Sequence, residues 1–437
     1  MIHLKKTGSA SFLTLICLFG FTSLSVVFAQ SEEEPSTAPI GRIAYIGSDL
    51  NVYSLDLESE LSVPMTTDAL VQNSARTLRF YSWPTWSQDN RLAYFANEYA
   101  LNGDNSLEVF ISSDGVAEGE RAFSFQDTAL TYAQWAPQNC TIDSRCRDLA
   151  LLLSRPNQAG FSVELMRNLA DKTERIRTGI GVPFYFSWSP DGTRMLRHRD
   201  GTLIDLYSVV DETVETVISN RAGTFGAPAW SPVDDRLLFT TRDDEMVIQS
   251  GDNAPQVLVN NLRGATAFAW SHNGNLVAYT NSLGAVIVRD SVSGDIISQS
   301  PVEGVLAFFW SPDSSKIAYI TATTSLDDFN ARDTNSAPHL AAMIQTSPQI
   351  AWSVLDVLTG ENRRYGAFTP TPDLTYLLSY FDQFSVSHRL WSPDSRHLVY
   401  SEVTNNDRSV ISILDVMRSI AVPFIVADGE IGIWSFQ

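Results

Sequence analysis

The stretch Trp188-Ser-Pro-Asp-Gly192, followed by the apolar pair Met195-Leu196, decides the fold, because close copies of it recur along the chain. Ser, Pro, Asp and Gly suit successive positions of a type I turn, so the stretch predicts a hairpin between two short strands. Self-similarity at a period of about 40 residues, written in strand-forming residues, predicts a radial array of small sheets. The copies begin at Trp86, Trp188, Trp230, Trp270, Trp310, Trp391 and Trp434, with a degenerate Trp-Ala copy at Trp135.

A second hairpin follows each copy. One example is the apolar run from Val286 to Val288, a turn around Gly294, and a second apolar run at Ile296 and Ile297. Two hairpins per period make a four-stranded blade, which is too small to bury its faces alone and must pack against neighbouring blades. We interpret the long interval between Trp310 and Trp391 as one blade with insertions. The prediction is an all-β chain, a single eight-bladed β-propeller of four-stranded antiparallel blades.

The two ends of the repeat region complement each other. The segment Ile433-Trp-Ser-Phe-Gln437 contains the first strand of a repeat, and Gly41-Arg-Ile-Ala-Tyr-Ile46 contains a second strand without a first. We therefore expect the C-terminal strand to join the first blade and to close the ring, which removes exposed sheet edges. The propeller is expected to cover residues 41–437.

Residues 1–29 have the pattern of a secretory signal peptide, with Lys5 and Lys6 ahead of an apolar run and small residues up to Ala29. The alternative is an uncleaved membrane anchor. Cleavage would leave a flexible segment over residues 30–40 and a protein located outside the cytoplasm, in a periplasm, at a cell surface or secreted. It would also remove two lysines and take the formal net charge from −20 to about −22. Such a charge disfavours nucleic acid and anionic lipid surfaces as partners, and no membrane insertion is expected after cleavage.

Cys140 and Cys146 remain after cleavage, and in an exported protein they predict a local disulfide. No metal site is predicted from two thiols without a nearby histidine. Short acidic stretches at 102–106, 327–333 and 405–407 carry the oxygen ligands that calcium prefers, but none has full calcium-loop spacing, so calcium is a weak alternative to solvated loops. No cofactor is expected.

The segments Trp-Ser-Pro-Asp-Gly/Ser followed by Ile/Leu-Ala/Val-Tyr resemble the repeats of the TolB-type, WD-like propeller family, over about residues 41–437. Similar repeats occur in the propeller domains of prolyl-oligopeptidase and dipeptidyl-peptidase relatives. The resemblance implies the architecture and little about activity. TolB carries an α/β domain before its propeller, and the peptidases carry an α/β-hydrolase domain, whereas this sequence shows neither, and it has no Gly-x-Ser-x-Gly nucleophile elbow.

The tryptophans of the repeat are predicted to pack between blades, and the turn aspartates Asp191, Asp313 and Asp394 to bond their own backbone. Trp83 and Trp352 lie outside the repeat and are expected to be freer to bind a ligand.

Loop lengths are uneven. Turns within hairpins are short and emerge on one face, which we call the short-turn face. The long connections at 67–82, 97–107, 321–349 and 366–386 emerge on the opposite face, which we call the long-loop face. Loops on a rigid scaffold are where binding usually resides. The alternative is that several of their aromatic side chains only anchor their own loops. The candidate binding residues are Tyr81, Trp83, Tyr99, Asp327, Asp328, Arg332, Asp333, His339, Tyr380, Phe381 and His388.

Two functional hypotheses follow. The first is an exported, monomeric, non-catalytic scaffold that binds a protein, or an envelope glycan or other ligand, on the long-loop face. The second is a glycan-active hydrolase or lyase with its site at the channel mouth, for which Asp327, Asp333, His339 and His388 are the candidates. No recognisable catalytic motif is present, so the first is preferred.

Overall fold

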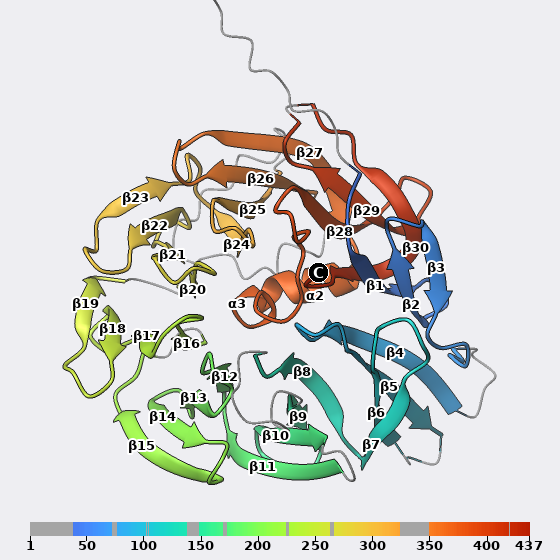
Figure 1. The fold of residues 1–437 in the computed structure, drawn as a ribbon, viewed down its shortest axis with the longest axis horizontal. Coiled ribbons are helices and arrows are strands. Elements are labelled where there is room, and N and C mark those ends of the chain that lie inside the picture. The colour runs from blue at the N-terminus through green and yellow to red at the C-terminus, as the bar shows by residue number, and fades with distance from the viewer. Residues whose placement is uncertain are drawn as a thin grey trace, which may run out of the picture.

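The computed structural model describes residues 38–71, 77–101, 103, 105–137, 148–168, 173–223, 227–262, 266–323, 349–418 and 420–437. These residues form small antiparallel sheets arranged around a central axis like the blades of a propeller (Figure 1). Within the described ranges the strands make up eight blades, as the repeat predicts.

Blades 2 to 6 are separate four-stranded sheets whose strands are hydrogen-bonded in chain order. Blade 2 is β4 (Thr77–Trp86), β5 (Leu92–Ala100), β6 (Asn105–Ser112) and β7 (Glu120–Gln126). Blade 3 is β8 (Ala129–Trp135), β9 (Leu149–Ser154), β10 (Phe161–Asn168) and β11 (Thr173–Gly181). Blade 4 is β12 (Phe184–Trp188), β13 (Arg194–Arg199), β14 (Leu203–Ser208) and β15 (Thr213–Ser219). Blade 5 is β16 (Ala229–Trp230), β17 (Arg236–Thr240), β18 (Met246–Ser250) and β19 (Gln256–Val259), and blade 6 is β20 (Phe268–Trp270), β21 (Leu276–Thr280), β22 (Val286–Asp290) and β23 (Ile296–Gln299).

Blades 7, 8 and 1 share a continuous ladder of strands. Blade 7 is β24 (Val305–Trp310), β25 (Lys316–Ala322), β26 (Ile350–Asp356) and β27 (Asn362–Pro370). Blade 8 has a short inner strand, seen as a bridge between Trp391 and Leu398, followed by β28 (His397–Val403), β29 (Ser409–Asp415) and the start of β30 (Phe424–Trp434). Blade 1 is the end of β30, then β1 (Arg42–Gly47), β2 (Val52–Asp56) and β3 (Leu61–Pro64).

Strand β30 closes the ring as predicted. Its first half pairs with β29, where Asp428 lies opposite Val410, and its second half pairs with β1, where Trp434 lies opposite Ile43. Beyond the strand, the backbone N–H of Ser435 donates to the carbonyl of Arg42 at 2.8 Å. One strand therefore serves two blades, and separating the ends of the chain would break both pairings.

The repeat tryptophans lie in the core, as predicted. Each is at most 7% exposed. The indole N–H of Trp135 donates to the Thr85 carbonyl of blade 2 at 2.9 Å, and that of Trp391 donates to the Phe309 carbonyl of blade 7 at 3.1 Å. Trp270 and Trp310 make the same kind of bond to the preceding blade. These four indoles join neighbouring blades by packing and by a hydrogen bond, whereas the indole N–H of Trp230 donates within its own blade, to the Asp234 carbonyl.

The turn aspartates also behave as predicted. In the turn after Trp188, the backbone N–H of Thr193 donates to Oδ1 of Asp191 at 3.0 Å, and the hydroxyl of Ser189 donates to the same oxygen at 2.6 Å. Asp313 and Asp394 repeat this arrangement in blades 7 and 8. These bonds lower the pKa of Asp191 below its usual value despite partial burial. Each carboxylate therefore stabilises its own turn.

Two helices lie across the central channel, between blade 7 and blade 8 in the chain (Figure 1). They are α2 (Pro372–Ser379) and α3 (Phe381–Phe384), and we call residues 371–388 the plug. Thr371 caps α2 by accepting a hydrogen bond from the Leu374 N–H at 3.3 Å, and Pro372 occupies the first turn, where a missing N–H costs nothing. The segment was expected to be a loop at the channel mouth. It is instead helical, because its apolar side chains find a buried environment at the axis.

The plug contacts most of the ring. Phe384 packs on Trp83 of blade 2 and on Tyr132 of blade 3, with ring centroids 4.9 and 5.2 Å apart. The Gln383 amide donates to the carbonyl of Phe186 in blade 4 at 3.2 Å. Phe381 packs edge-on against Phe308 of blade 7 at 5.1 Å. The plug thus belongs to the hydrophobic core that the inner strands form.

Candidate functional site

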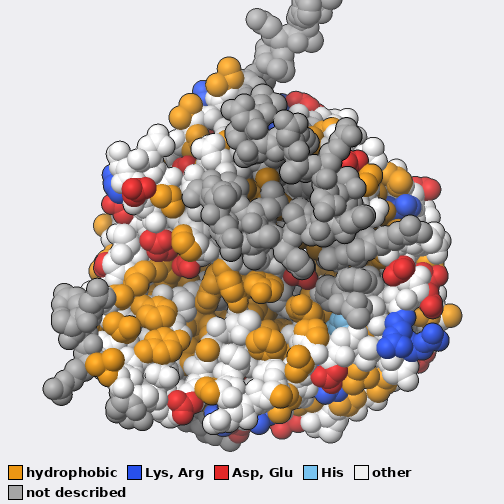
Figure 2. Space-filling view, turned by 180° about the vertical axis from the view of Figure 1, so that it is seen from behind, with side chains coloured by type: hydrophobic (Ala, Val, Ile, Leu, Met, Phe, Trp, Pro, Cys, Tyr) orange, Lys and Arg blue, Asp and Glu red, His pale blue; other side chains and the backbone are white. Residues whose placement is uncertain are grey.

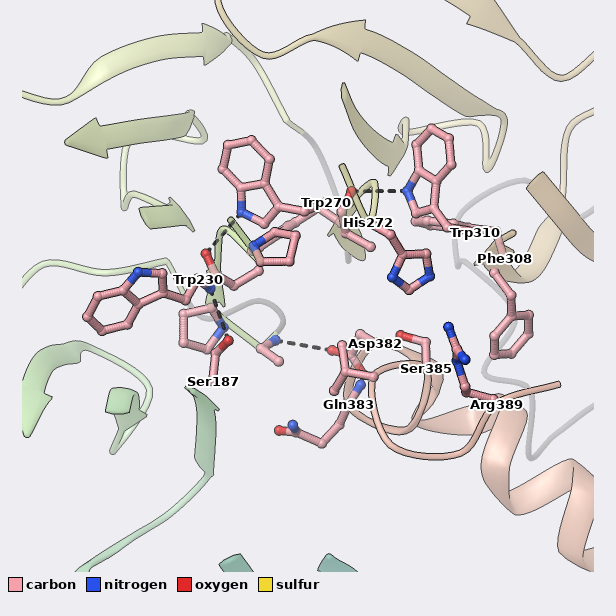
Figure 3. Close-up of a pocket in the computed structure, with 18 of the residues that line it drawn as sticks. Ser187, Trp230, Trp270, His272, Phe308, Trp310, Asp382, Gln383, Ser385 and Arg389 are labelled. Atoms are coloured by element: carbon pink, nitrogen blue, oxygen red, sulfur yellow. Dashed lines mark hydrogen bonds between the residues drawn. The ribbon is translucent and has the colours of Figure 1, made fainter. Parts of the chain in front are cut away.

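A cavity of about 120 Å³ lies in the channel between α3 and the inner strands of blades 4 to 8 (Figure 3). Its far end is bounded by Asp382 and Gln383 of the plug, and its near end by Pro232, His272 and Pro312 from three hairpin turns. Since those turns belong to the short-turn face, the cavity opens toward that face. A concave, mostly apolar space with a few convergent polar groups is the default candidate for a binding site.

The walls of the cavity are aromatic and preorganised. Phe308 is 1% exposed and Trp310 is 6% exposed, so both are held by the packing of blade 7. The indole N–H of Trp310 is already bonded to the carbonyl of Ala269, at 3.4 Å. The tryptophans therefore offer apolar surface to the cavity and do not offer their N–H groups.

Three ionisable side chains line the cavity. The carboxylate of Asp382 accepts a hydrogen bond from the backbone N–H of Ala227 at 3.1 Å, while burial raises the pKa of this carboxyl group. Burial lowers the pKa of Arg389 to about 10, so the guanidinium is still charged at neutral pH. His272 is exposed at the mouth of the cavity, and desolvation by the neighbouring walls together with the positive charge of Arg389 lowers its pKa below the usual value, so its imidazole is neutral at pH 7.

Figure 3 shows the imidazole of His272 and the guanidinium of Arg389 directed into the same space. Arg389 is only partly buried, and among the described residues no carboxylate lies within ion-pair distance of it. Its close partner is the ring of Phe436, with 4.3 Å between the guanidinium carbon and the ring centroid. The cavity therefore contains a cation that is not neutralised by an ion pair.

Neither cavity residue was proposed as a binding group from the sequence, although the repeat contained the signal. Two positions before the repeat tryptophan, blades 4, 6 and 7 have Phe186, Phe268 and Phe308, whereas blade 8 has Arg389. In blade 6, His272 occupies the turn position at which blades 4, 5, 7 and 8 have proline. A comparison of the repeat copies position by position would have identified both.

The long-loop face carries exposed aromatic and apolar side chains. Tyr380 and Tyr376 of the plug are 48% and 37% exposed, and Tyr99 and Leu101 of blade 2 are 41% and 84% exposed. We call these four residues the aromatic surface. Figure 2 shows hydrophobic side chains gathered over this part of the face, between the rim and the centre.

The blade-2 part of this surface is strand, where a long loop was expected. Strands β4 and β5 are paired from Thr77 with Ala100 to Trp86 with Leu92, so much of 67–82 and 97–107 is an extended ribbon. The stacked rings of Phe80 and Tyr99, 5.9 Å apart, lie on this ribbon. The two connections are as long as expected, but they are paired strands and therefore belong to the sheet of blade 2.

Three of the candidate binding residues are buried and do not form a contact surface. The hydroxyl of Tyr81 donates to Asp68 at 2.6 Å, and its ring is 3% exposed. Phe381 is 9% exposed against blade 7, and His388 is fully buried. Trp83 is half-buried and packs on Tyr376 at 5.3 Å. For these side chains the alternative, that the aromatics hold their own segments in place, is the better description.

His388 has a closed environment. Its Nδ1 lies 2.7 Å from the Ser387 hydroxyl and its Nε2 lies 3.4 Å from the Thr85 hydroxyl, and burial lowers its pKa to about 3. It has no exposed edge for a substrate. Trp352 was expected to be free for binding, which is wrong: it is 1% exposed and packs against Phe309 and Tyr400.

The remaining candidates lie outside the described residues. They are the proposed signal peptide at 1–29, the cysteine pair Cys140 and Cys146, and the candidate binding residues Asp327, Asp328, Arg332, Asp333 and His339. Most of the segment 30–40 is outside them as well. Among the residues that are described, no group of three or more His, Cys, Asp or Glu side chains is placed to hold a metal ion. No helix in the same part of the chain is long and apolar enough to cross a membrane.

No model of a protein family matches the chain, and no curated protein matches it. Several solved propeller structures resemble it. A crystal structure described as the eukaryotic initiation factor is 11% identical, with a TM-score of 0.51, 92% of this chain covered and 98% of that one. TolB from Acinetobacter baumannii is 14% identical over 84% of this chain and 86% of that one, with a TM-score of 0.37. The C-terminal WD40 domain of Sif2 is 13% identical over 75% of this chain and 84% of that one, with a TM-score of 0.48.

At such identities a likeness concerns the fold, and a fold alone does not assign an activity. The fold presents its loops from a rigid ring. The pairing of the strands and the Trp-Ser-Pro-Asp repeat agree with that likeness. The chain has the β-propeller fold.

Proposed function

We propose that this protein is an exported, non-catalytic scaffold that binds a partner protein through the aromatic surface of its long-loop face. The observation that carries the proposal is the exposure of Tyr376 and Tyr380 on the plug and of Tyr99 and Leu101 at the end of β5, because both segments belong to connections of the long-loop face. Aromatic groups with a polar edge are favoured in protein interfaces, because they bury a large area and lose little conformational entropy.

The surface rests on a rigid base. On its inner side α2 buries Leu374, Leu377 and Leu378, so Tyr376 is fixed by a helix that the channel holds in place. Trp83 supports Tyr376 from below at 5.3 Å and has a positive φ of 48°, at a bulge in β4 between Ser82 and Thr85. A bulge redirects a side chain, and here it directs the indole toward the plug. A preorganised surface pays less entropy on binding than a mobile one.

The non-catalytic part of the proposal is supported by the burial of His388, which is one of the four candidates of the enzyme hypothesis and the one among the described residues. General acid–base catalysis needs a group within hydrogen-bond reach of the substrate. His388 is fully buried, and its two ring nitrogens face the hydroxyls of Ser387 and Thr85. Export is supported by the signal-peptide pattern of residues 1–29.

Photo-crosslinking tests the proposal. A photoreactive amino acid placed at Tyr99 or Tyr380 in the full chain, expressed in its native cells, should yield a defined crosslinked protein species. The same amino acid at Leu358, which is 83% exposed in the turn between β26 and β27 on the short-turn face, is the matched control. Equal crosslinking from all three positions would show that the long-loop face has no special role.

A second arm separates binding from folding. The double variant Tyr376→Ser, Tyr380→Ser should lose the crosslink from Tyr99 while still unfolding in one cooperative transition, at a melting temperature lowered only by the loss of the ring contacts of Tyr376 with Trp83 and Phe384. An undiminished crosslink in this folded variant would refute the role of the aromatic surface.

A further inference from the structure

Two residues that differ from the consensus of the repeat, in different blades, line the same channel cavity. At the second position of the hairpin turn, blades 4, 5, 7 and 8 have proline, and blade 6 has His272. Two residues before the repeat tryptophan, blades 4, 6 and 7 have phenylalanine, and blade 8 has Arg389. The two residues are more than a hundred positions apart in the chain, and both side chains enter the same space (Figure 3).

Arg389 stands at a repeat position that holds phenylalanine in blades 4, 6 and 7, and the surrounding cavity wall is largely aromatic. Its neighbours in the cavity wall include Phe186, Phe268 and Phe308 from the other inner strands. An arginine in such a wall needs a counter-charge, because a partly desolvated cation without one is unfavourable. No carboxylate among the described residues pairs with it, and Asp382, on the same cavity, accepts instead from the backbone N–H of Ala227.

The contacts that Arg389 makes with the described residues do not neutralise its charge. Its backbone bridges to Trp434 in the neighbouring inner strand, a contact that any residue makes with its main chain. Its guanidinium carbon lies 4.3 Å from the centroid of the Phe436 ring, and no carboxylate of the described residues accepts a hydrogen bond from its N–H donors. Those donors form a fork that matches the two oxygens of a carboxylate.

We propose that the cavity binds a small monocarboxylate, with its carboxylate on Arg389 and His272 and its short apolar body against Phe308. A single cation neutralises a single negative charge, which favours a monoanion over a phosphate. The neutral imidazole of His272 contributes one hydrogen bond. A cavity of about 120 Å³ has room for about four water molecules, which is the size of a short-chain acid or an acidic amino-acid side chain.

This site is separate from the aromatic surface. The cavity opens between turns of the short-turn face, and the plug lies between it and the long-loop face. The carboxylate has two possible sources: a free short-chain acid, or a glutamate side chain of a peptide. Both present the same group to Arg389, and an experiment with two ligands distinguishes them.

Isothermal titration calorimetry on the full chain tests the proposal, with butyrate in one arm and an acetylated, amidated tripeptide, Ala-Glu-Ala, in the other. We expect saturable binding of one of these probes and a melting temperature that rises with its concentration. In Arg389→Gln the affinity should fall about tenfold or more, as expected for the loss of a charged hydrogen bond. His272→Pro restores the residue of the repeat and should weaken binding by a smaller factor while keeping the turn.

Arg242→Gln is the matched control, because Arg242 is an exposed arginine between β17 and β18 at the opposite end of the blade. It should bind like the wild type. If Arg389→Gln does not fold, Arg389→Lys and His272→Pro still decide the question, since a lysine retains the charge without the fork and should bind more weakly. Absence of binding by both probes, or equal binding by the wild type and a folded His272→Pro or Arg389 variant, would overturn the proposal.

Discussion

Replacing His388 with glutamine should make the stability of the protein less dependent on pH in the acidic range. His388 is fully buried, and burial lowers its pKa from 6.5 to about 3. The unfolded chain therefore takes up a proton at this residue below pH 6.5, whereas the folded protein does so only near pH 3. Because the unfolded state binds more protons over that interval, the free energy of unfolding decreases as the pH falls.

The magnitude follows from the two pKa values. One pH unit between them corresponds to about 1.4 kcal/mol, so His388 alone removes at most about 5 kcal/mol between pH 6.5 and pH 3. Such a loss is comparable to the whole stability of many domains. Glutamine does not titrate, so the variant loses this part of the pH dependence whatever its stability at neutral pH.

Urea unfolding at several values between pH 4 and 7, followed by tryptophan fluorescence, measures the slope. Ser387→Ala is the matched control, because it removes the hydroxyl 2.7 Å from Nδ1 and leaves the titrating ring in place. The wild type and Ser387→Ala should share the steeper slope, and His388→Gln should be flatter. Parallel profiles for the wild type and His388→Gln would refute the argument that burial suppresses protonation of this histidine.

Three further predictions concern the ring and the plug. Trp310→Ala should lower the free energy of unfolding by about 3–5 kcal/mol in denaturant titration, because it empties a buried site between blades, and a near-neutral effect would contradict this packing role. Deletion of residues 431–437 removes the strand segment that pairs with β1, so calorimetry should no longer show one cooperative transition, and an unchanged melting temperature would contradict closure by β30. Asp373→Asn should raise the stability at pH 7 by about 1–2 kcal/mol after allowance for partial exposure, since burial and the charge of Glu430 raise the pKa of Asp373 to about 6 and penalise its charged form above that pH. This gain should disappear as the pH falls below about 4, and a gain independent of pH would show that the cause is not ionisation.

Most of the architecture was predictable from the sequence because it depends on local chemistry. The turn residues Ser189 to Gly192 specify their own hairpin through bonds within a few residues. The tryptophan at the end of each inner strand repeats with the period of the blade, so its role could be inferred once and applied to all copies. Closure by β30 was predictable because the incomplete repeat at one end matches the incomplete repeat at the other.

The plug was missed, although its sequence carries an ordinary helix signal. Thr371 is a good N-cap, Pro372 suits the first turn, and Leu374, Leu377 and Leu378 recur at helical spacing. The repeat directed attention to strands, and a long connection between blades was interpreted as a loop. The burial of Phe381 and His388 follows directly from that helix, so their expected exposure was wrong for the same reason.

By itself, the sequence determined the blade, the number of blades, and the closure of the ring, because each depends on residues close together in the chain or on a pattern that repeats. Only the tertiary structure decided what occupies the axis. Each blade contributes only one or two residues to the channel. No short segment of sequence therefore specifies which side chains line the channel or what fills it. Its contents depend on how side chains from distant strands converge. For this reason α2 and α3, the burial of His388, and the meeting of His272 with Arg389 became visible only in three dimensions.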